Sequence, residues 1–137
     1  MANRRKPDSG SKSSTPLDDY KAFIDALVEI RPDVCARWVR EKRAWPDLPA
    51  NKAINAFVAK LTDAQREVLA TLLLHARDGG IHDTLAYLTD EINRKGLRIV
   101  RNGRELLVEP FGTEMYYDWT CRREGDPWPK ADGESEA

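Results

Sequence analysis

Cysteine, histidine and long apolar runs are scarce in this 137-residue chain. Its two cysteines and two histidines include no Cys-x-x-Cys or His-x-x-x-His pair, so we expect no metal and no other cofactor. Cys35 and Cys121 are too few for a disulfide scaffold and are expected to be free thiols. No run approaches the roughly 18 apolar residues of a membrane helix, and no apolar stretch follows the basic N-terminal residues. We therefore expect a cytoplasmic protein with no membrane partner.

The composition is that of one folded domain with tails. Apolar residues make up 41% and charged residues 33%, which suits a globular protein with a modest core. Residues 1–14 are rich in Ser, Lys and Gly and lack an apolar anchor, and residues 129–137 are acidic. We expect both segments to be disordered tails around a single globular domain over residues 15–128.

Apolar residues recur at three- and four-residue steps over much of the chain, which predicts helices. Thr15 and Pro16 suit the cap and first position of one helix, and Pro49 begins another after a turn with two prolines. Thr62 and Gln65 have the spacing of a capping box and begin the clearest helix. Its predicted buried face comprises Val68, Leu69, Leu72, Leu73 and Ala76.

Glycine pairs and single glycines predict where these helices end. Gly79-Gly80 should stop the helix that begins at Thr62. A further helix should then bury Ile81, Leu85, Leu88 and Ile92.

The helical period changes near residue 97. The pattern LRIV-RNGR-ELLV places Asn102-Gly103 between two short apolar runs and predicts a hairpin over about residues 97–108. Residues 114–124 fit either a helix or an alternating strand, and we favour a helix because Gly125 is a natural stop. The predicted fold is therefore mainly α with a small β-hairpin (α+β), a compact single domain of five to six helices.

Residues 61–92, LTDAQREVLATLLLHARDGGIHDTLAYLTDEI, have the form of a helix-turn-helix. The Gln-Arg-Glu-Val-Leu string resembles the first helix of sigma-factor and response-regulator DNA-binding domains. Recognition helices present basic or amide side chains to DNA. The second helix here would instead present Asp83, Asp90 and Glu91, which DNA phosphates repel. We therefore expect a structural helix pair and not a DNA-binding one.

The stretch YYDWTCRREGDPWP, residues 116–129, combines aromatic rings with arginines. Such residues are enriched at the energetic centres of protein interfaces. The leading hypothesis is a non-enzymatic module that binds a protein partner or a second copy of itself through Tyr116, Tyr117, Arg122, Arg123 and Trp128. The alternative is structural, with the tryptophans of this stretch closing the core.

Two other functions stay open. His75, His82 and Asp83 could form the centre of a metal-dependent hydrolase, although related metal phosphohydrolase sites need a further histidine that this chain lacks. RNA binding is the third hypothesis, through residues 37–45, RWVREKRAW, whose basic and aromatic side chains suit single-stranded nucleic acid. The structural alternative is a helix with Trp38 on its apolar side and the arginines in solvent.

Several motifs of the C-terminal half occur together: GGIHDTLAYL, the Asn-Gly hairpin, EPFGTEMYYDW and RREGDPWP. In this combination, over about residues 61–129, the chain resembles a small bacterial family of uncharacterised cytosolic proteins. The resemblance implies a bacterial origin and a single compact domain. It transfers no catalytic or binding residue, because the family has no established activity.

Overall fold

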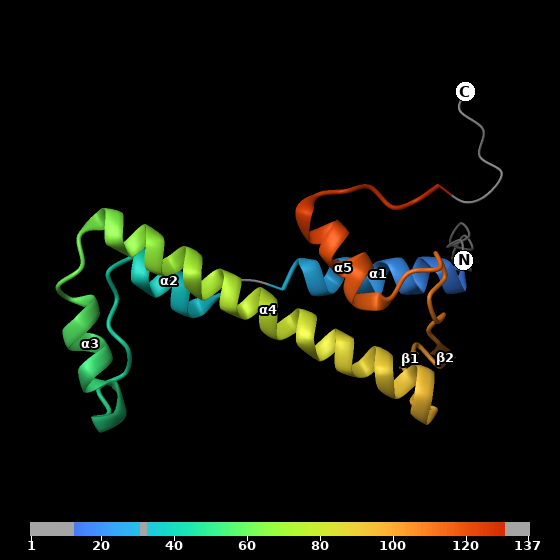
Figure 1. The fold of residues 1–137 in the computed structure, drawn as a ribbon, viewed down its shortest axis with the longest axis horizontal. Helices are drawn as coiled ribbons and strands as arrows, with labels where there is room; N and C mark the ends of the chain where they lie inside the picture. The colour runs from blue at the N-terminus through green and yellow to red at the C-terminus, as the bar shows by residue number, and fades with distance from the viewer. Residues whose placement is uncertain (1–12, 31–32, 131–137) are drawn as a thin grey trace, which may run out of the picture.

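The computed structural model describes residues 13–30 and 33–130, so the tails expected at 1–14 and 129–137 lie mostly outside the described residues. Within those residues the chain forms five α-helices, one short 3-10 helix and one two-stranded hairpin (Figure 1). In chain order the elements are α1 (Pro16–Val28), α2 (Val34–Arg40), η1 (Pro49–Asn51), α3 (Lys52–Val58), α4 (Asp63–Lys95), β1 (Val100–Arg101), β2 (Arg104–Glu105) and α5 (Met115–Glu124). The prediction of a mainly α fold with a small hairpin is confirmed.

Helix α4 is the long axis of the molecule. Its 33 residues span about 50 Å at 1.5 Å per residue. In Figure 1, α2 lies along its N-terminal half and α3 lies near its N-terminal end, whereas α1, α5 and the hairpin lie at its C-terminal half. The predicted stop at Gly79-Gly80 is wrong, because α4 continues through both glycines to Lys95. A helix-turn-helix is therefore absent from this segment, which is one helix.

Local capping chemistry sets the helix starts. The Thr15 hydroxyl accepts the Asp18 backbone N–H, and the Asp18 carboxylate accepts the Thr15 backbone N–H. These bonds to Thr15 lower the pKa of Asp18. Thr62 and Gln65 form the same reciprocal pair at the start of α4. Both predicted starts are confirmed, since each depends only on residues three positions apart.

The larger apolar cluster lies between α1, α5 and the C-terminal half of α4. Its buried side chains are Tyr20, Ile24, Leu85, Ile92, Met115 and Trp119. The apolar stripe predicted after Gly80 is confirmed, because Leu85 is 3% exposed and Ile81 packs against the cluster. The Asp83 side chain is 87% exposed and points away from this core.

A buried carboxylate joins α5 to α1 inside this cluster. Asp118 accepts the Tyr20 hydroxyl at 2.6 Å and the Thr113 hydroxyl at 2.5 Å. Burial, and then the bond to Asp118, raise the pKa of Tyr20 well above its ordinary value. Because buried polar groups are costly without partners, the two hydroxyls stabilise this carboxylate in the interior.

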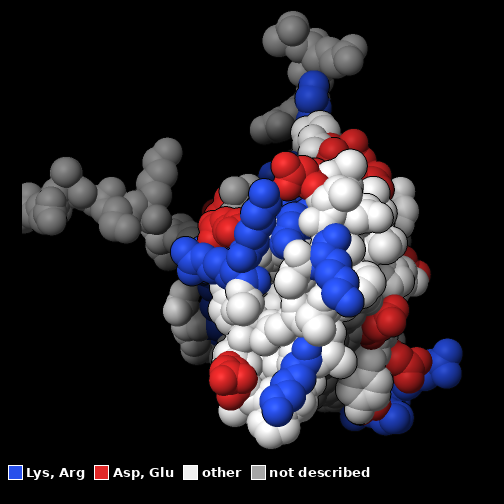
Figure 2. All heavy atoms as spheres, turned by 90° about the vertical axis from the view of Figure 1, so that its left-hand side faces the viewer, with Lys and Arg blue, Asp and Glu red and all other residues white. Residues whose placement is uncertain are grey.

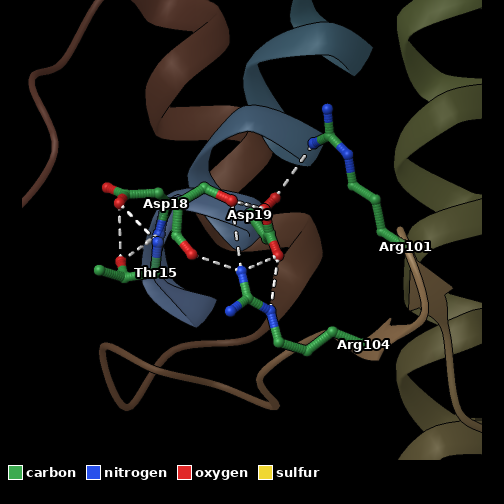
Figure 3. Close-up of polar contacts among 6 residues, drawn as sticks. Thr15, Asp18, Asp19, Arg101 and Arg104 are labelled. Atoms are coloured by element: carbon green, nitrogen blue, oxygen red, sulfur yellow. Dashed lines mark hydrogen bonds and ion pairs between the residues drawn. The ribbon is translucent and has the colours of Figure 1, made fainter. Parts of the chain in front are cut away.

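The hairpin is tied to the first turn of α1. Asn102 and Gly103 adopt the positive φ angles of 52° and 75° that a tight two-residue turn requires. The ladder is shorter than residues 97–108, since only Val100–Arg101 and Arg104–Glu105 are strands. Figure 3 shows Arg104 reaching from the hairpin to the nearly buried Asp19.

Arg104 donates to Asp19 through Nε at 2.9 Å and Nη2 at 2.5 Å. Arg101 adds a bond at 3.2 Å to the Asp19 backbone carbonyl (Figure 3). The guanidinium of Arg104 is the main reason that the pKa of Asp19 is lowered. The ion pair and the hydrogen bonds fix the hairpin against α1. They are needed because strands of two residues are too short to form a stable hairpin by their own pairing.

The smaller apolar cluster lies where α2 crosses the N-terminal half of α4. Its fully buried members are Ala36, Val39 and Ala70. Small side chains at this crossing let the two helices approach closely. The predicted buried face of α4 is wrong in part: Val68 and Leu72 are 63% and 58% exposed, and Ala76 is exposed as well. The face of α4 that α2 covers is centred on Ala70, so these three side chains lie outside it.

None of the described helices is both long and apolar enough to cross a membrane.

Candidate functional site

The C-terminal aromatic and arginine residues lie mostly inside a network that joins the end of the described chain to α1. The Trp128 ring stacks on Phe111 at 5.4 Å between centroids, and its indole N–H donates to Asp25 at 3.0 Å. Arg122 donates to the same carboxylate at 2.8 Å, and its guanidinium lies 5.2 Å from the Trp128 ring centroid. Trp128 and Arg122 therefore contribute to the fold directly.

The other residues of this set differ in exposure. Tyr116 is half-buried, with its ring 5.1 Å from that of His82. Arg123 forms an ion pair with Asp78 at 2.9 Å. Tyr117 is 52% exposed. Of the tyrosines and tryptophan in this set, Tyr117 is thus the one that presents most of its ring to solvent.

A cleft of about 240 Å³ lies between α5 and the segment after it, lined in part by Tyr117, Cys121 and Asp126. A side-chain hydrogen bond with Cys121, one helical turn away, raises the pKa of Tyr117. A cysteine nucleophile needs a base to activate its thiol. The lining contains no histidine, and its Asp118 already accepts two hydroxyls. The cleft does not contain the groups of a cysteine-dependent catalytic site.

His75, His82 and Asp83 do not converge. His82 Nδ1 lies 3.4 Å from its neighbour Asp83, whose side chain is in solvent. His75 is seven residues earlier on the same helix, about 10 Å away along the axis. Within residues 13–30 and 33–130, no three His, Cys, Asp or Glu side chains are grouped so that they could hold a metal ion. The geometry required by the hydrolase hypothesis is therefore not formed.

The basic stretch 37–45 is largely neutralised by acids. Each of its four basic side chains lies within 4.0 Å of a carboxylate oxygen, in the pairs Arg37–Glu41, Arg40–Glu67, Lys42–Asp63 and Arg43–Glu41. Trp38 and Trp45 are half-buried and pack edge to face at 5.6 Å. A surface that attracts RNA needs unneutralised positive charge beside exposed rings, and this stretch offers little of either.

An apolar groove between α3 and the N-terminal half of α4 is open to solvent. Three large side chains along it are more than half exposed: Phe57 at 59%, Val68 at 63% and Leu72 at 58%. One depression is lined by Phe57, Leu61, Ala64, Val68, Leu69 and Leu72. A second adjoins it through Phe57 and Leu69 and extends to Trp45, Ile54 and Leu73. We call this continuous surface the α3–α4 groove.

Polar bonds hold α3 in place and leave its apolar face open. The buried Arg66 donates to the backbone carbonyls of Val39 and Val58, at the ends of α2 and α3, at 3.0 and 2.6 Å. The Asn55 side chain makes a matched pair of bonds with the Trp45 backbone, at 2.8 and 3.1 Å. Val58 is the one buried residue of α3. The groove is therefore part of a fixed arrangement of helices.

The solvent-facing side of α4 changes character along its length. Of the exposed residues between positions 64 and 80, Glu67 is the only one with a charge, and it pairs with Arg40 of α2. Beyond position 80 the exposed residues include Asp83, Arg94 and Lys95. Figure 2, which views the molecule from the end where α3 lies, shows uncharged surface crossed by several basic side chains, with acidic side chains around its edge. A helix face in contact with water normally carries charged and polar residues. The exposed side of the first half of α4 is instead poor in charge: besides Glu67, its polar residues are Gln65, Thr71 and His75.

Comparison with known proteins identifies the family. A model described as a family of unknown function, DUF6547, matches residues 13–130. The chain belongs to this family. The matched range contains all five helices, the hairpin and the groove. No curated protein matches the chain, and no solved structure does either. Membership of DUF6547 therefore assigns no role to any residue, and the site has to be judged on its own geometry.

Sequence reasoning missed the groove because it assigned Val68 and Leu72 to the core. A signal was present in the run from Val68 to Leu74, which is apolar at every position except Thr71. Such a run covers more than one side of a helix, so a single neighbour such as α2 cannot bury all of it. More apolar residues in this half of α4 than α2 alone can cover predict a second contact.

Proposed function

We propose that this chain is a non-enzymatic protein-binding module whose binding site is the α3–α4 groove. The observation that supports the proposal is the exposure of Phe57, Val68 and Leu72 along one continuous surface. Full burial of such a side chain contributes about 1.5–3 kcal/mol. Covering the exposed fractions of all three would contribute roughly 3–5 kcal/mol before the cost of association.

The shape of the site favours a helical segment of a protein as the ligand. Two helices flank a long apolar depression, which is the arrangement that accepts an amphipathic helix. Catalysis needs several convergent polar groups in a pocket. The lining of the groove is apolar apart from Gln65, the Cys35 thiol and the Trp45 indole N–H. Binding without chemistry is therefore the function that this surface supports.

The proposal places the main contact away from the C-terminal aromatic residues. Binding through Arg122 or Trp128 would cost the bonds that these residues make with Asp25. Tyr117 is exposed and could contribute a lesser contact without that cost. We place the binding in the cytoplasm, a location that the free thiols of Cys35 and Cys121 support.

The test is site-specific photo-crosslinking in the cells that produce the chain. A photoreactive phenylalanine replaces Leu72 in one variant and Tyr87 in the control. Both positions lie on α4 and have similar exposure, 58% and 62%, but position 87 is outside the groove. We expect protein adducts from position 72, identified by peptide mass, and few from position 87. Equal labelling, or no protein adduct at position 72, would refute the proposal.

A further inference from the structure

The α3–α4 groove raises the question of what covers it, and the chain's own remaining segments do not suit it. Residues 1–12, MANRRKPDSGSK, contain no apolar residue beyond Met1 and Ala2. Residues 131–137, ADGESEA, are acidic with alanine as their only apolar residue, and residues 31–32 are Arg-Pro. None of these segments offers the large apolar side chains that would fill an apolar groove. Among the residues of this sequence, those outside the described ranges therefore do not supply a suitable occupant.

We infer that this occupant is the same groove of a second copy of the chain, so that two copies pair across a two-fold axis near Leu72. The inference rests on the proposed function and names the partner. In a two-fold interface each surface patch meets itself. A residue near the axis then faces its own copy, and a charged residue there would face a like charge at short range.

The α4 face satisfies that requirement. From position 64 to position 80 its exposed residues are uncharged except for Glu67, which Arg40 holds on the α2 side. A foreign partner would not require the absence of charge, because opposite charges on the two proteins could pair. Self-pairing does require it near the axis, so the distribution of charge along α4 favours a second copy.

The sizes of the side chains fit an antiparallel pair of α4 helices. With Leu72 at the axis, residues four positions before it face residues four positions after it in the other copy. Val68 then meets Ala76, and Ala64 meets Gly80, so that larger residues lie opposite smaller ones. This alternation lets facing layers interdigitate.

The apolar area is of the size that a modest dimer uses. Ile54, Phe57, Val68 and Leu72 are between 41% and 63% exposed, which leaves roughly 300–400 Å² of apolar surface in water. A standard interface buries about 800 Å² on each partner, of which about 55–65% is apolar. These four residues supply most of that apolar share, and neighbouring alanines add to it. We expect a dissociation constant roughly in the micromolar range.

Sedimentation equilibrium of the full purified chain tests the inference. Wild type is expected to approach twice its mass of 15.6 kDa at concentrations above roughly 50 µM. Leu72→Glu places two carboxylates at the axis and is expected to remain monomeric. Tyr87→Glu, on the charged half of the same helix and equally exposed, is expected to dimerise like wild type. Circular dichroism checks that each variant is folded. We expect both to fold, because positions 72 and 87 are exposed and a charged side chain there stays in water.

A charge-reversal mixture tests the axis itself. Leu72→Glu and Leu72→Lys should each be monomeric alone, whereas an equimolar mixture should form a heterodimer because opposite charges then face each other. Dimeric wild type without rescue in the mixture would overturn the placement of Leu72 at the axis. Monomeric wild type at every concentration would overturn self-pairing. Crosslinks from position 72 to a different protein would in that case still support the proposed function.

Discussion

Gly79 and Gly80 lie in the interior of α4, where glycine is the least favourable residue after proline. Glycine in a helix interior is less stable than alanine by about 0.8–1.0 kcal/mol. A Cβ placed at either position meets no atom within 4 Å. The substitution Gly→Ala at each site therefore removes the glycine penalty without adding a clash. The expected gain in the free energy of unfolding is about 1.6–2 kcal/mol for the double variant, since adjacent helix positions do not face each other.

Thermal and urea unfolding followed by circular dichroism measure this gain. For a domain of this size, the double variant should melt about 6–8 °C above wild type. All proteins are compared at one concentration, because self-association would make the melting temperature depend on it. The matched control is Gly96→Ala. Gly96 ends α4 with a φ of +76°, a conformation that costs alanine about 1–2 kcal/mol, so this variant should melt below wild type.

Comparing the double variant with Gly96→Ala distinguishes a helix that continues through Gly79-Gly80 from a helix that ends there. If the chain stopped its helix at Gly79-Gly80, at least one of these residues would adopt a positive φ, and alanine there would destabilise the protein as it does at position 96. A double variant that melts at or below wild type would therefore refute a continuous α4. A rise of several degrees beside a fall for Gly96→Ala would support it.

Three further substitutions test the polar contacts that hold the helices together. Tyr20→Phe should lower the free energy of unfolding, measured in urea, by about 1.5–3 kcal/mol, because it removes a hydrogen bond to the buried Asp118 carboxylate. The loss of stability caused by Tyr20→Phe should be smaller when Asp118 is already replaced by Asn. Equal losses in the two backgrounds would show that the Tyr20 hydroxyl and the Asp118 carboxylate do not stabilise each other. Asp19 has a lowered pKa, so its contribution to stability is complete above about pH 4 and is lost as the pH falls through the lower folded pKa. Arg104→Gln should therefore be less stable at pH 7 and lose less of its remaining stability in acid, as urea midpoints at both pH values would show. Arg66→Met removes the guanidinium bonds to the Val39 and Val58 carbonyls, which keep only the longer 3.3 Å bonds from the Lys42 and Leu61 backbone N–H groups. It should cost about 1–3 kcal/mol in urea unfolding; an unchanged midpoint would contradict this role.

The parts of the fold that depend on neighbouring residues could be predicted from the sequence. Thr15 and Thr62 begin helices because their hydroxyls reach backbone N–H groups three positions ahead. The Asn102-Gly103 turn and the end of α5 at Gly125 follow from the positive φ angles that these residues accept. The helix favoured over residues 114–124 is confirmed as α5. In each case the energies that decide the structure lie within a few residues.

The errors concern choices that depend on distant parts of the chain. Gly79-Gly80 was expected to end a helix, but a penalty of about 1 kcal/mol per glycine is smaller than the packing that fixes α4 at both of its ends. The face of α4 that is buried depends on where α2 crosses it, at Ala70, and apolar periodicity alone cannot locate that crossing. For the same reason the α3–α4 groove could not be predicted, since its exposed leucine and valine look like core residues in the sequence.

Helices α1 and α5, which lie near the two ends of the described chain, pack in the same apolar cluster. Because both elements pack at the C-terminal half of α4, the two ends of the described chain lie at the opposite end of the molecule from the groove (Figure 1). In an antiparallel pair, the polypeptide ends of the two copies would sit at opposite poles of an elongated rod. Whatever is attached to either terminus, a fluorophore or a fused enzyme, would then be carried at the tips and kept apart from its counterpart.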